Sequence, residues 1–213
     1  MFNKSYFINH ISNRERRGMT LVEILVAVSI LVIVMVAVAT FQYNVLDYNR
    51  YSQVALTNVQ DATNILKYMS KELRTMSPSA NGSYPILFAA TSSLTFHSDI
   101  EGDGAKEQIR YYIASTTLYR GIIVSSGSPP TYNPANENKN IIASGVRNAT
   151  SSALFEYFDG SYDGNGQPLT YPLTIYTIRL VRINIMIDSD PKKSPLPIIY
   201  TTQVSLRNIK DNI

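Results

Sequence analysis

The chain has 213 residues, of which 45% are hydrophobic and 16% charged, and its formal net charge is +3. This length suits one ordinary domain plus an additional segment, and the composition is that of a folded protein rather than a disordered one. With no cysteine, the chain forms no disulfide, thiolate metal site or cysteine nucleophile. The small net charge does not indicate nucleic-acid binding, because part of the positive excess lies in Lys4, Arg14, Arg16 and Arg17.

The N-terminal part of the sequence divides into a basic segment and a long apolar run. Residues 1–18 are polar and end in Arg16-Arg17-Gly18, whereas residues 19–41 are almost entirely apolar. At about 1.5 Å per residue, a helix over residues 19–41 is about 34 Å long, enough to cross the hydrocarbon core of a bilayer. Because basic residues precede the run, the positive-inside rule places the N-terminus in the cytoplasm and the chain after Phe41 outside. The sequence therefore predicts a single-pass protein of the cytoplasmic membrane.

Glu23 is the only ionisable residue in this apolar run, and three interpretations treat it differently. A secretory signal peptide has a shorter apolar region followed by a small-residue cleavage site, and Val38-Ala39-Thr40 is a poor site of that kind. A plain signal anchor accounts for the length but not for a carboxylate, which costs up to about 2.5–3.5 kcal/mol at the bilayer centre and less near its edge. The third interpretation gives Glu23 a function.

The stretch Arg16–Ala27, which reads Arg-Arg-Gly-Met-Thr-Leu-Val-Glu-Ile-Leu-Val-Ala, resembles the cleavage and anchor motif of type IV prepilins. The resemblance implies that a prepilin peptidase cuts between Gly18 and Met19 on the cytoplasmic side and that the new amine of Met19 is N-methylated. Glu23 then becomes the fifth residue of the mature chain, where the family has a glutamate. Two features depart from many major pilins: Met19 stands in place of a Phe, and no Pro occurs before Pro78.

Cleavage after Gly18 leaves the apolar run attached and creates a positively charged amine at the end of the helix. The Glu23 carboxylate of one subunit can pair with the Met19 amine of a neighbour, and two such charges about 4 Å apart attract by about 4 kcal/mol at an effective dielectric constant near 20. The resemblance implies that such helices leave the membrane lipid and pack as the core of a filament. It also implies the partners, which are other pilin or pseudopilin subunits, the prepilin peptidase and an assembly platform in the inner membrane.

Beyond Phe41 the apolar residues recur at spacings of four and three, which is the pattern of an amphipathic helix. This apolar stripe consists of Ala55, Val59, Ala62, Leu66, Met69, Leu73 and Met76. Pro78 and Asn81-Gly82 are expected to end the helix. The sequence therefore predicts one helix from near Thr20 to about Met76, in which residues 19–41 form the transmembrane or filament-core part and residues 42–77 lie on a domain.

From Tyr84 onward, short runs of alternating apolar and polar residues indicate strands. Ser93–Ser98 and Gln108–Ile113 are separated by the turn Glu101–Gly104 and are expected to form a hairpin. Further strands are expected at residues 118–124, 153–158, 173–187 and 198–206, and loops at residues 125–139, 159–166 and 188–197. A long helix followed by a mostly antiparallel β-sheet over residues 78–213 is an α+β fold.

The hairpin region extends the resemblance. Residues 94–104, Ile109–Ile113 and Leu118–Arg120 are similar to the globular domain of minor pilins, in particular the J-type minor pseudopilin of type II secretion and the W-type minor pilin of type IV pili. The same segments also make sense simply as paired strands. Pilus, secretion pseudopilus and DNA-uptake filament share one anchor, so the sequence does not separate them.

Asp99, Glu101 and Asp103, with Glu107 nearby, form the only dense carboxylate group of the sequence. Their spacing begins like a calcium-binding loop, so these three residues are a candidate calcium site. The twelfth position is Arg110, however, where such a loop needs a bidentate Glu. A charged hairpin turn is therefore the favoured interpretation.

The remaining candidate sites are weaker. Asp159, Asp163 and Asn165 alternate with glycines and favour a turn. His97, the only histidine after residue 18, is expected as a solvent-facing or packed strand residue, and Asn148 begins a glycosylation sequon that matters only if the host has that pathway. With one histidine, no cysteine and no phosphate-binding loop, the sequence predicts no catalytic residue and no cofactor.

Three functional classes follow from these features. The first is a structural, minor subunit of a type IV pilus-like filament or a type II secretion pseudopilus, in which Glu23 serves assembly. The second is a single-pass anchored binding domain that does not polymerise, which would keep residues 1–18. The third is an anchored enzyme such as a glycan hydrolase, which would depend on a pair of carboxylates.

Overall fold

The computed structural model describes residues 18–148, 152–188, 198–207 and 209. The predicted leader lies outside these residues except for Gly18. The chain divides into two units, residues 1–48 and residues 49–213. In the first unit the described secondary structure is the beginning of α1, Leu21–Arg74, and the rest of α1 belongs to the second unit. The predicted helix is thus confirmed, and it ends at Arg74, two residues before the expected end at Met76.

The length of α1 follows from its composition, because no Gly or Pro occurs between Met19 and Ser77. At its C-terminal end the helix tightens, since the amide of Thr75 donates to the carbonyl of Glu72 and that of Met76 to the carbonyl of Leu73, both three residues back. Met76 then leaves the helix and forms a bridge with Ser98 of the following sheet.

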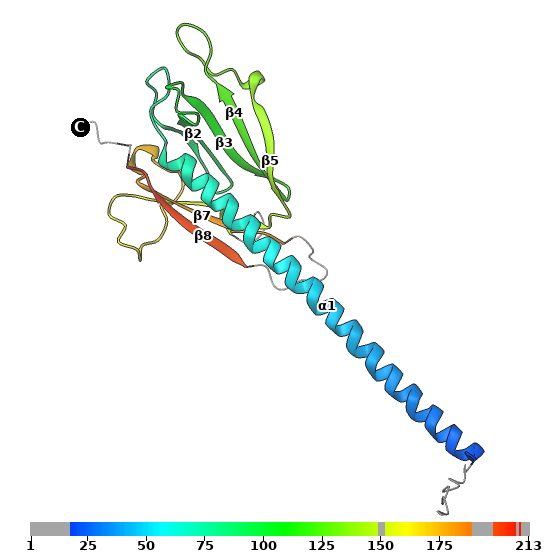
Figure 1. Cartoon of the computed structure of the whole chain (residues 1–213). Helices are drawn as coiled ribbons and strands as arrows, with labels where there is room; N and C mark the ends of the chain where they lie inside the picture. The colour runs from blue at the N-terminus through cyan, green and yellow to red at the C-terminus, as the bar shows by residue number, and fades with distance from the viewer. Residues whose placement is uncertain (1–17, 149–151, 189–197, 208, 210–213) are drawn as a thin grey trace, which may run out of the picture. The chain divides into compact units, whose positions relative to one another are not determined.

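The second unit contains two antiparallel sheets (Figure 1). Five strands form the first sheet in the order β1-β2-β3-β4-β5, with bounds Ile86–Ala89, Ser93–Ser98, Glu107–Ala114, Thr117–Val124 and Asn138–Ser144. Three strands form the second in the order β6-β7-β8, with bounds Phe155–Phe158, Leu180–Met186 and Ile199–Ser205. Short 3-10 helices occur at Pro134–Asn136 (η1) and Ile175–Thr177 (η2). The predicted α+β architecture is therefore present.

The predicted hairpin is confirmed, and in its register Ser93 pairs with Tyr112 and Ser98 with Glu107. The single long strand expected at residues 173–187 is wrong in its first half. There the amides of Thr177 and Ile178 bond three residues back to Thr174 and Ile175, which forms η2, and the strand β7 begins only at Leu180. Two strands were not predicted, β1 and β5, and β5 begins inside the segment expected as a loop.

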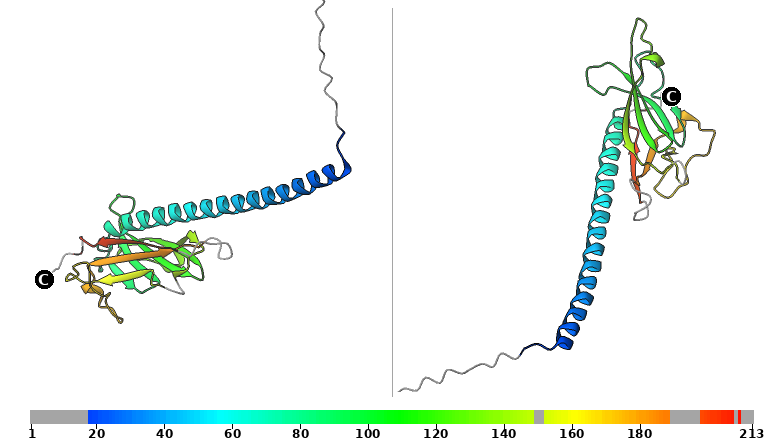
Figure 2. Two further views of the ribbon diagram at one scale, coloured as in Figure 1. Left: turned by 90° about the horizontal axis from the view of Figure 1, so that it is seen from below. Right: turned by 90° about the vertical axis from the view of Figure 1, so that its right-hand side faces the viewer.

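One hydrophobic core joins α1 to both sheets within the second unit. Ala62, Met69 and Leu73 of the predicted stripe are at most 1% exposed, and they pack with buried residues of β2, β3, β6 and β7. Val59, at the beginning of the stripe, is 39% exposed. Figure 2 shows the last turns of α1 lying along the strands. The amphipathic stripe thus becomes the helix face of this core, from Ala62 onward.

Candidate functional site

The predicted cleavage site lies just before the first turn of α1. Gly18 and Met19 are exposed and non-helical, and beyond its chain neighbours no described residue comes within 4 Å of where a Cβ of Gly18 would be. The hydroxyl of Thr20 accepts a hydrogen bond of 3.3 Å from the amide of Glu23, so Thr20 caps the helix. Thr20-x-x-Glu23 is the sequence of a capping box. The capping role of Thr20 was missed in the sequence analysis, although this four-residue pattern signals it.

Glu23 lies in the first turn of α1, where a carboxylate interacts favourably with the positive end of the helix dipole, by about 0.3–1 kcal/mol at an exposed site. An amine freed at Met19 would add a positive charge at this same helix end, which is unfavourable unless a carboxylate neutralises it. The first turn therefore places the Glu23 carboxylate close to the position of the Met19 amine that cleavage would create.

The apolar surface of α1 continues for many turns beyond Glu23. Large apolar side chains from Met19 to Phe41 are all at least 49% exposed, so the described residues do not bury them. After Glu23, the two hydroxyls of this stretch are satisfied within the helix, since Ser29 donates to the carbonyl of Leu25 and Thr40 to that of Val36, at 2.8 and 2.9 Å. By length and composition this helix can cross a membrane.

Comparison with known families adds the deciding observation. The prokaryotic N-terminal methylation motif matches residues 13–39, which include Gly18, Met19 and Glu23. This motif indicates that the chain is a type IV prepilin-like protein. A search of curated proteins found no match to the sequence. For a prepilin-like chain, the motif indicates interaction with a prepilin peptidase and with other pilin subunits, and together with the apolar helix it fits membrane anchoring.

The candidate calcium residues of this prepilin-like chain lie in the turn between β2 and β3. The Asp99 carboxylate accepts from the amides of Gly102 and Gly104, at 2.7 and 3.1 Å, and from the ammonium of Lys106 at 3.1 Å. The bond from Lys106 is the largest cause that lowers the pKa of Asp99. Asp103 in turn accepts from a backbone amide at 2.9 Å. The carboxylates of Asp99 and Asp103 thus stabilise the turn itself.

Among the described residues, no three or more His, Asp and Glu side chains come together as possible metal ligands. In the second candidate turn, Asp159 accepts from the amide and hydroxyl of Ser161, and Asp163 accepts from the amide of Asn165. Both are local turn contacts of the kind expected for Asp. Calcium binding at Asp99, Glu101 and Asp103 therefore remains a prediction without further support.

His97 and Asn148 both lie in the interior. His97 is 2% exposed, its ring centroid lies 4.9 Å from that of Tyr132, and burial lowers the pKa of its imidazole. The Asn148 amide nitrogen, where a glycan would be attached, donates to the carbonyl of Asn184 at 2.6 Å, and its oxygen accepts from the amide of Met186. Asn148 is therefore a buried structural residue; Ala149 and Thr150 of the sequon lie outside the described residues.

A buried polar cluster around Glu72 was missed in the sequence analysis. The Glu72 carboxylate is ion-paired with the guanidinium of Arg120, whose Nε also donates to it at 3.1 Å, and it accepts from the hydroxyl of Tyr111. Glu72 and Arg120 are 3% and 6% exposed, and Arg120 lies over the ring of Tyr68 at 5.2 Å. Burial and the nearby carboxylate raise the pKa of Tyr111, so the phenol stays a donor.

One sequence signal could have found this cluster. Glu72 lies three residues after Met69 and four before Met76, so it occupies a core-facing position of the helix. A charge at such a position indicates a buried partner, because an unpaired charge in a core is costly. The partner itself is set by strand register, since Tyr111 lies directly opposite Arg120 in the pairing of β3 with β4.

Proposed function

We propose that this chain is a structural minor subunit of a type IV pilus-like filament or of a type II secretion pseudopilus. It enters the cytoplasmic membrane once, with its N-terminus in the cytoplasm and residues 78–213 outside. A prepilin peptidase removes residues 1–18 and the amine of Met19 is N-methylated. Residues 19–41 then form the filament core, and residues 42–77 connect this core to the globular domain.

The observation that carries the proposal is the combination at the start of α1. An exposed, non-helical Gly18–Met19 peptide precedes a helix whose large apolar side chains stay exposed as far as Phe41. Glu23 is the single ionisable group of that stretch. In a monomeric anchor this carboxylate gains only its interaction with the helix dipole, while its place in an apolar stretch in lipid is costly. In a bundle of staggered helices it has a partner, the Met19 amine of a neighbour, so assembly removes the cost.

The alternative of an anchored binding domain that does not polymerise predicts a different N-terminus. Such a protein would keep residues 1–18 and would not need Glu23. The motif over residues 13–39 favours a processed subunit, and in that class the chain is a structural protein rather than an enzyme.

The experiment is intact mass and N-terminal sequencing of the chain purified from its own membranes, beside a Gly18→Ala variant. A native chain that begins at an N-methylated Met19, together with a variant that keeps its leader, supports the proposal. A native chain that begins at Met1 contradicts it and favours the anchored binding domain. A Ser12→Ala variant of the leader serves as a control, and its cleavage is expected to be normal.

A further inference from the structure

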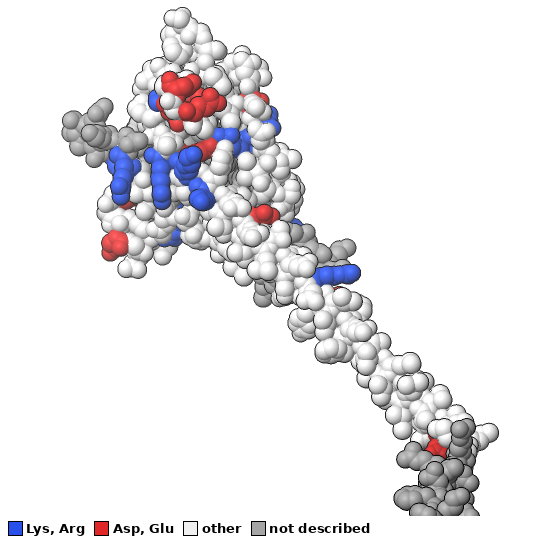
Figure 3. Space-filling model, viewed as in Figure 1, with Lys and Arg blue, Asp and Glu red and all other residues white. Residues whose placement is uncertain are grey.

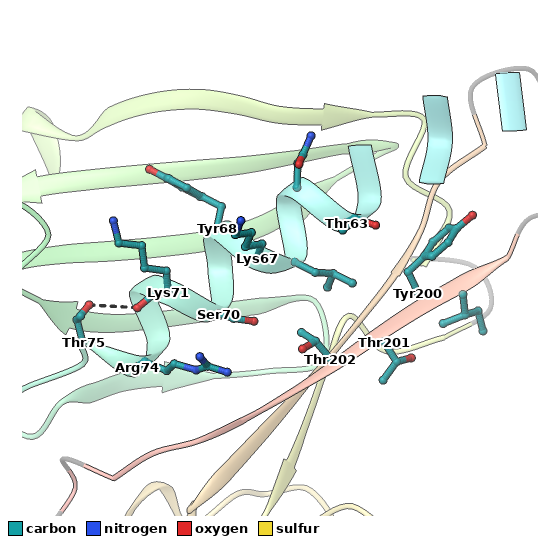
Figure 4. A pocket seen from close by; sticks show the side chains of 13 residues that line it. Thr63, Lys67, Tyr68, Ser70, Lys71, Arg74, Thr75, Tyr200, Thr201 and Thr202 are labelled. Carbon is teal, nitrogen blue, oxygen red and sulfur yellow. Dashed lines mark hydrogen bonds between the residues drawn. The ribbon is translucent and has the colours of Figure 1, made fainter. Parts of the chain in front are cut away.

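The second unit contains an open groove between the end of α1 and the strand β8 (Figure 4). Its volume is about 1000 Å³, at the upper end of the range for ligand pockets. The helix wall consists of Thr63, Asn64, Leu66, Lys67, Tyr68, Ser70, Lys71 and Arg74 of α1 with Thr75 directly after it, and the β8 wall of Ile199, Tyr200, Thr201 and Thr202. The groove is thus bounded by a helix on one side and by an edge strand on the other.

The charge of this groove is of one sign. Lys67, Lys71 and Arg74 line it, and no Asp or Glu does. None of these three cations forms an ion pair with a described residue. Figure 3 shows Lys and Arg side chains side by side over the last turns of α1. Lys67 and Arg74 are two helical turns apart and so lie on one side of α1. An anionic ligand complements this wall.

The opposite wall is a strand with a free edge. β8 pairs with β7 on one side only, and on its other side no described strand pairs with it. Every second residue of such a strand directs its N–H and C=O away from its one neighbour, which forms a template for another extended chain.

β8 also lacks the features that protect the other sheet edges. Natural edge strands are usually short, bulged or charged. β1 has four residues and an irregular register, β5 contains Lys139 and an irregular register, and β6 has four residues and contains Glu156. In contrast, β8 is seven residues long, pairs without a shift and contains no charge or proline. Of the four described edges, β8 is the one open to an added strand.

Ser70 lines the groove and carries a polar atom without a partner among the described residues. The Ser70 hydroxyl is buried and forms no hydrogen bond with the described residues, although a hydroxyl in a helix often bonds to the preceding turn. Its side chain and that of Arg74 lie on the side of α1 that faces β8 (Figure 4). A buried polar group without a partner costs free energy, so the Ser70 hydroxyl would gain from a polar ligand atom that reached it.

We propose that this groove binds an extended acidic segment of a partner polypeptide. The segment adds as a strand to the free edge of β8, and its carboxylates pair with Lys67, Lys71 and Arg74. Backbone hydrogen bonds to β8 supply affinity that does not depend on the sequence of the bound segment. The cations of α1 select for segments with acidic side chains. The proposal is independent of cleavage after Gly18, because the groove lies entirely within residues 63–75 and 199–202.

The test uses the full chain in an uncharged detergent and a fluorescein-labelled ten-residue peptide in which Glu alternates with Thr or Val. Two matched peptides carry Lys in place of Glu, or N-methyl groups on four consecutive central residues, which block both hydrogen-bonding edges. Fluorescence anisotropy gives Kd, and hydrogen exchange of β8 locates the bound peptide. The acidic peptide is expected to bind and to slow exchange of β8 amides, and both matched peptides to bind at least about tenfold more weakly.

The chain variants separate the groove from general attraction to basic surface. Lys67→Glu with Arg74→Glu is expected to weaken binding by at least about tenfold, whereas Arg50→Glu, an exposed cation of the same helix outside the groove, leaves Kd unchanged. Equal binding of the N-methylated peptide, or protection elsewhere than β8, would overturn the proposal. The chain without peptide is measured at several concentrations. If its β8 amides exchange slowly and this protection disappears on dilution, a second copy of the chain occupies the edge, and the proposal is overturned.

Discussion

The carboxylate of Glu72 lies in the core between the guanidinium of Arg120 and the hydroxyl of Tyr111. Removing one partner of a buried ion pair leaves the other charge uncompensated. We therefore expect Glu72→Met to lower the free energy of unfolding by about 3–5 kcal/mol, and Glu72→Met with Arg120→Met to be less destabilised than the single variant. Urea unfolding of the detergent-solubilised chain, followed by the near-UV circular dichroism of its tyrosines, measures both.

Asp61→Met is the control for this prediction, since Asp61 is an exposed acid on the same helix. A surface change of this kind is expected to stay within about 0.5 kcal/mol. If Glu72→Met were no more destabilising than Asp61→Met, the cluster would contribute little to stability.

Burial lowers the pKa of His97 below its ordinary value of 6.5. Below pH 6.5 the imidazole of the unfolded chain is therefore protonated while that of the folded chain is still neutral. The free energy of unfolding falls as the pH falls from 6.5 to the lower pKa of the folded chain. We expect the Tm of the processed or full-length chain to be a few degrees lower at pH 5.5 than at pH 7.5. In a His97→Gln variant the difference in Tm between the two pH values should be smaller. If it is unchanged, the pH dependence comes from another titratable group.

At the scale of elements, α1 offers two leucines with opposite environments. Leu73 is 1% exposed in the core and Leu56 is 65% exposed. Leu73→Ala is expected to lower the free energy of unfolding by about 2–5 kcal/mol, because it removes buried contacts and leaves a cavity, whereas Leu56→Ala should cost less than about 1 kcal/mol. The same urea titration compares them, and equal losses would contradict the packing of α1 on the sheets.

The elements that the sequence predicted well are those with strong local signals. α1 has a long apolar pattern without Gly or Pro, and the hairpin of β2 and β3 has an acidic, glycine-containing turn. β1 is too short to show alternation, and β5, Asn138–Ser144, is mostly polar and exposed, so its strand character comes from pairing with β4. The error over residues 173–178 has the same origin, since an apolar pattern cannot distinguish a 3-10 turn from a strand.

At the scale of the whole molecule, Glu23 serves assembly rather than anchoring in our proposal. Glu23→Ala should therefore still reach the membrane and lose its leader, but its amount in sheared filaments, or its recovery with other pilin-like subunits, should fall at least about tenfold. The physical reason is the loss of the carboxylate that pairs with a neighbour's Met19 amine. Immunoblots of membrane and sheared fractions measure both steps.

Ser29→Ala is the matched control, because Ser29 is polar and lies in the same apolar stretch, yet bonds only within its own helix. Its assembly is expected to be normal. Normal assembly of Glu23→Ala would remove the charge pairing from the proposal, while leaving the cleavage site untouched.

The sequence by itself indicated the prepilin-like class and the α+β architecture and predicted a membrane anchor, because each depends on local order along the chain: the motif over residues 13–39, the continuous apolar run and the alternating pattern of the strands. The functions of Gly18, Met19 and Glu23 remain predictions. Only the tertiary structure decided the second sheet, the Glu72 cluster and the groove beside β8. These features join residues far apart in sequence, and strand register and helix packing, rather than local pattern, bring them together.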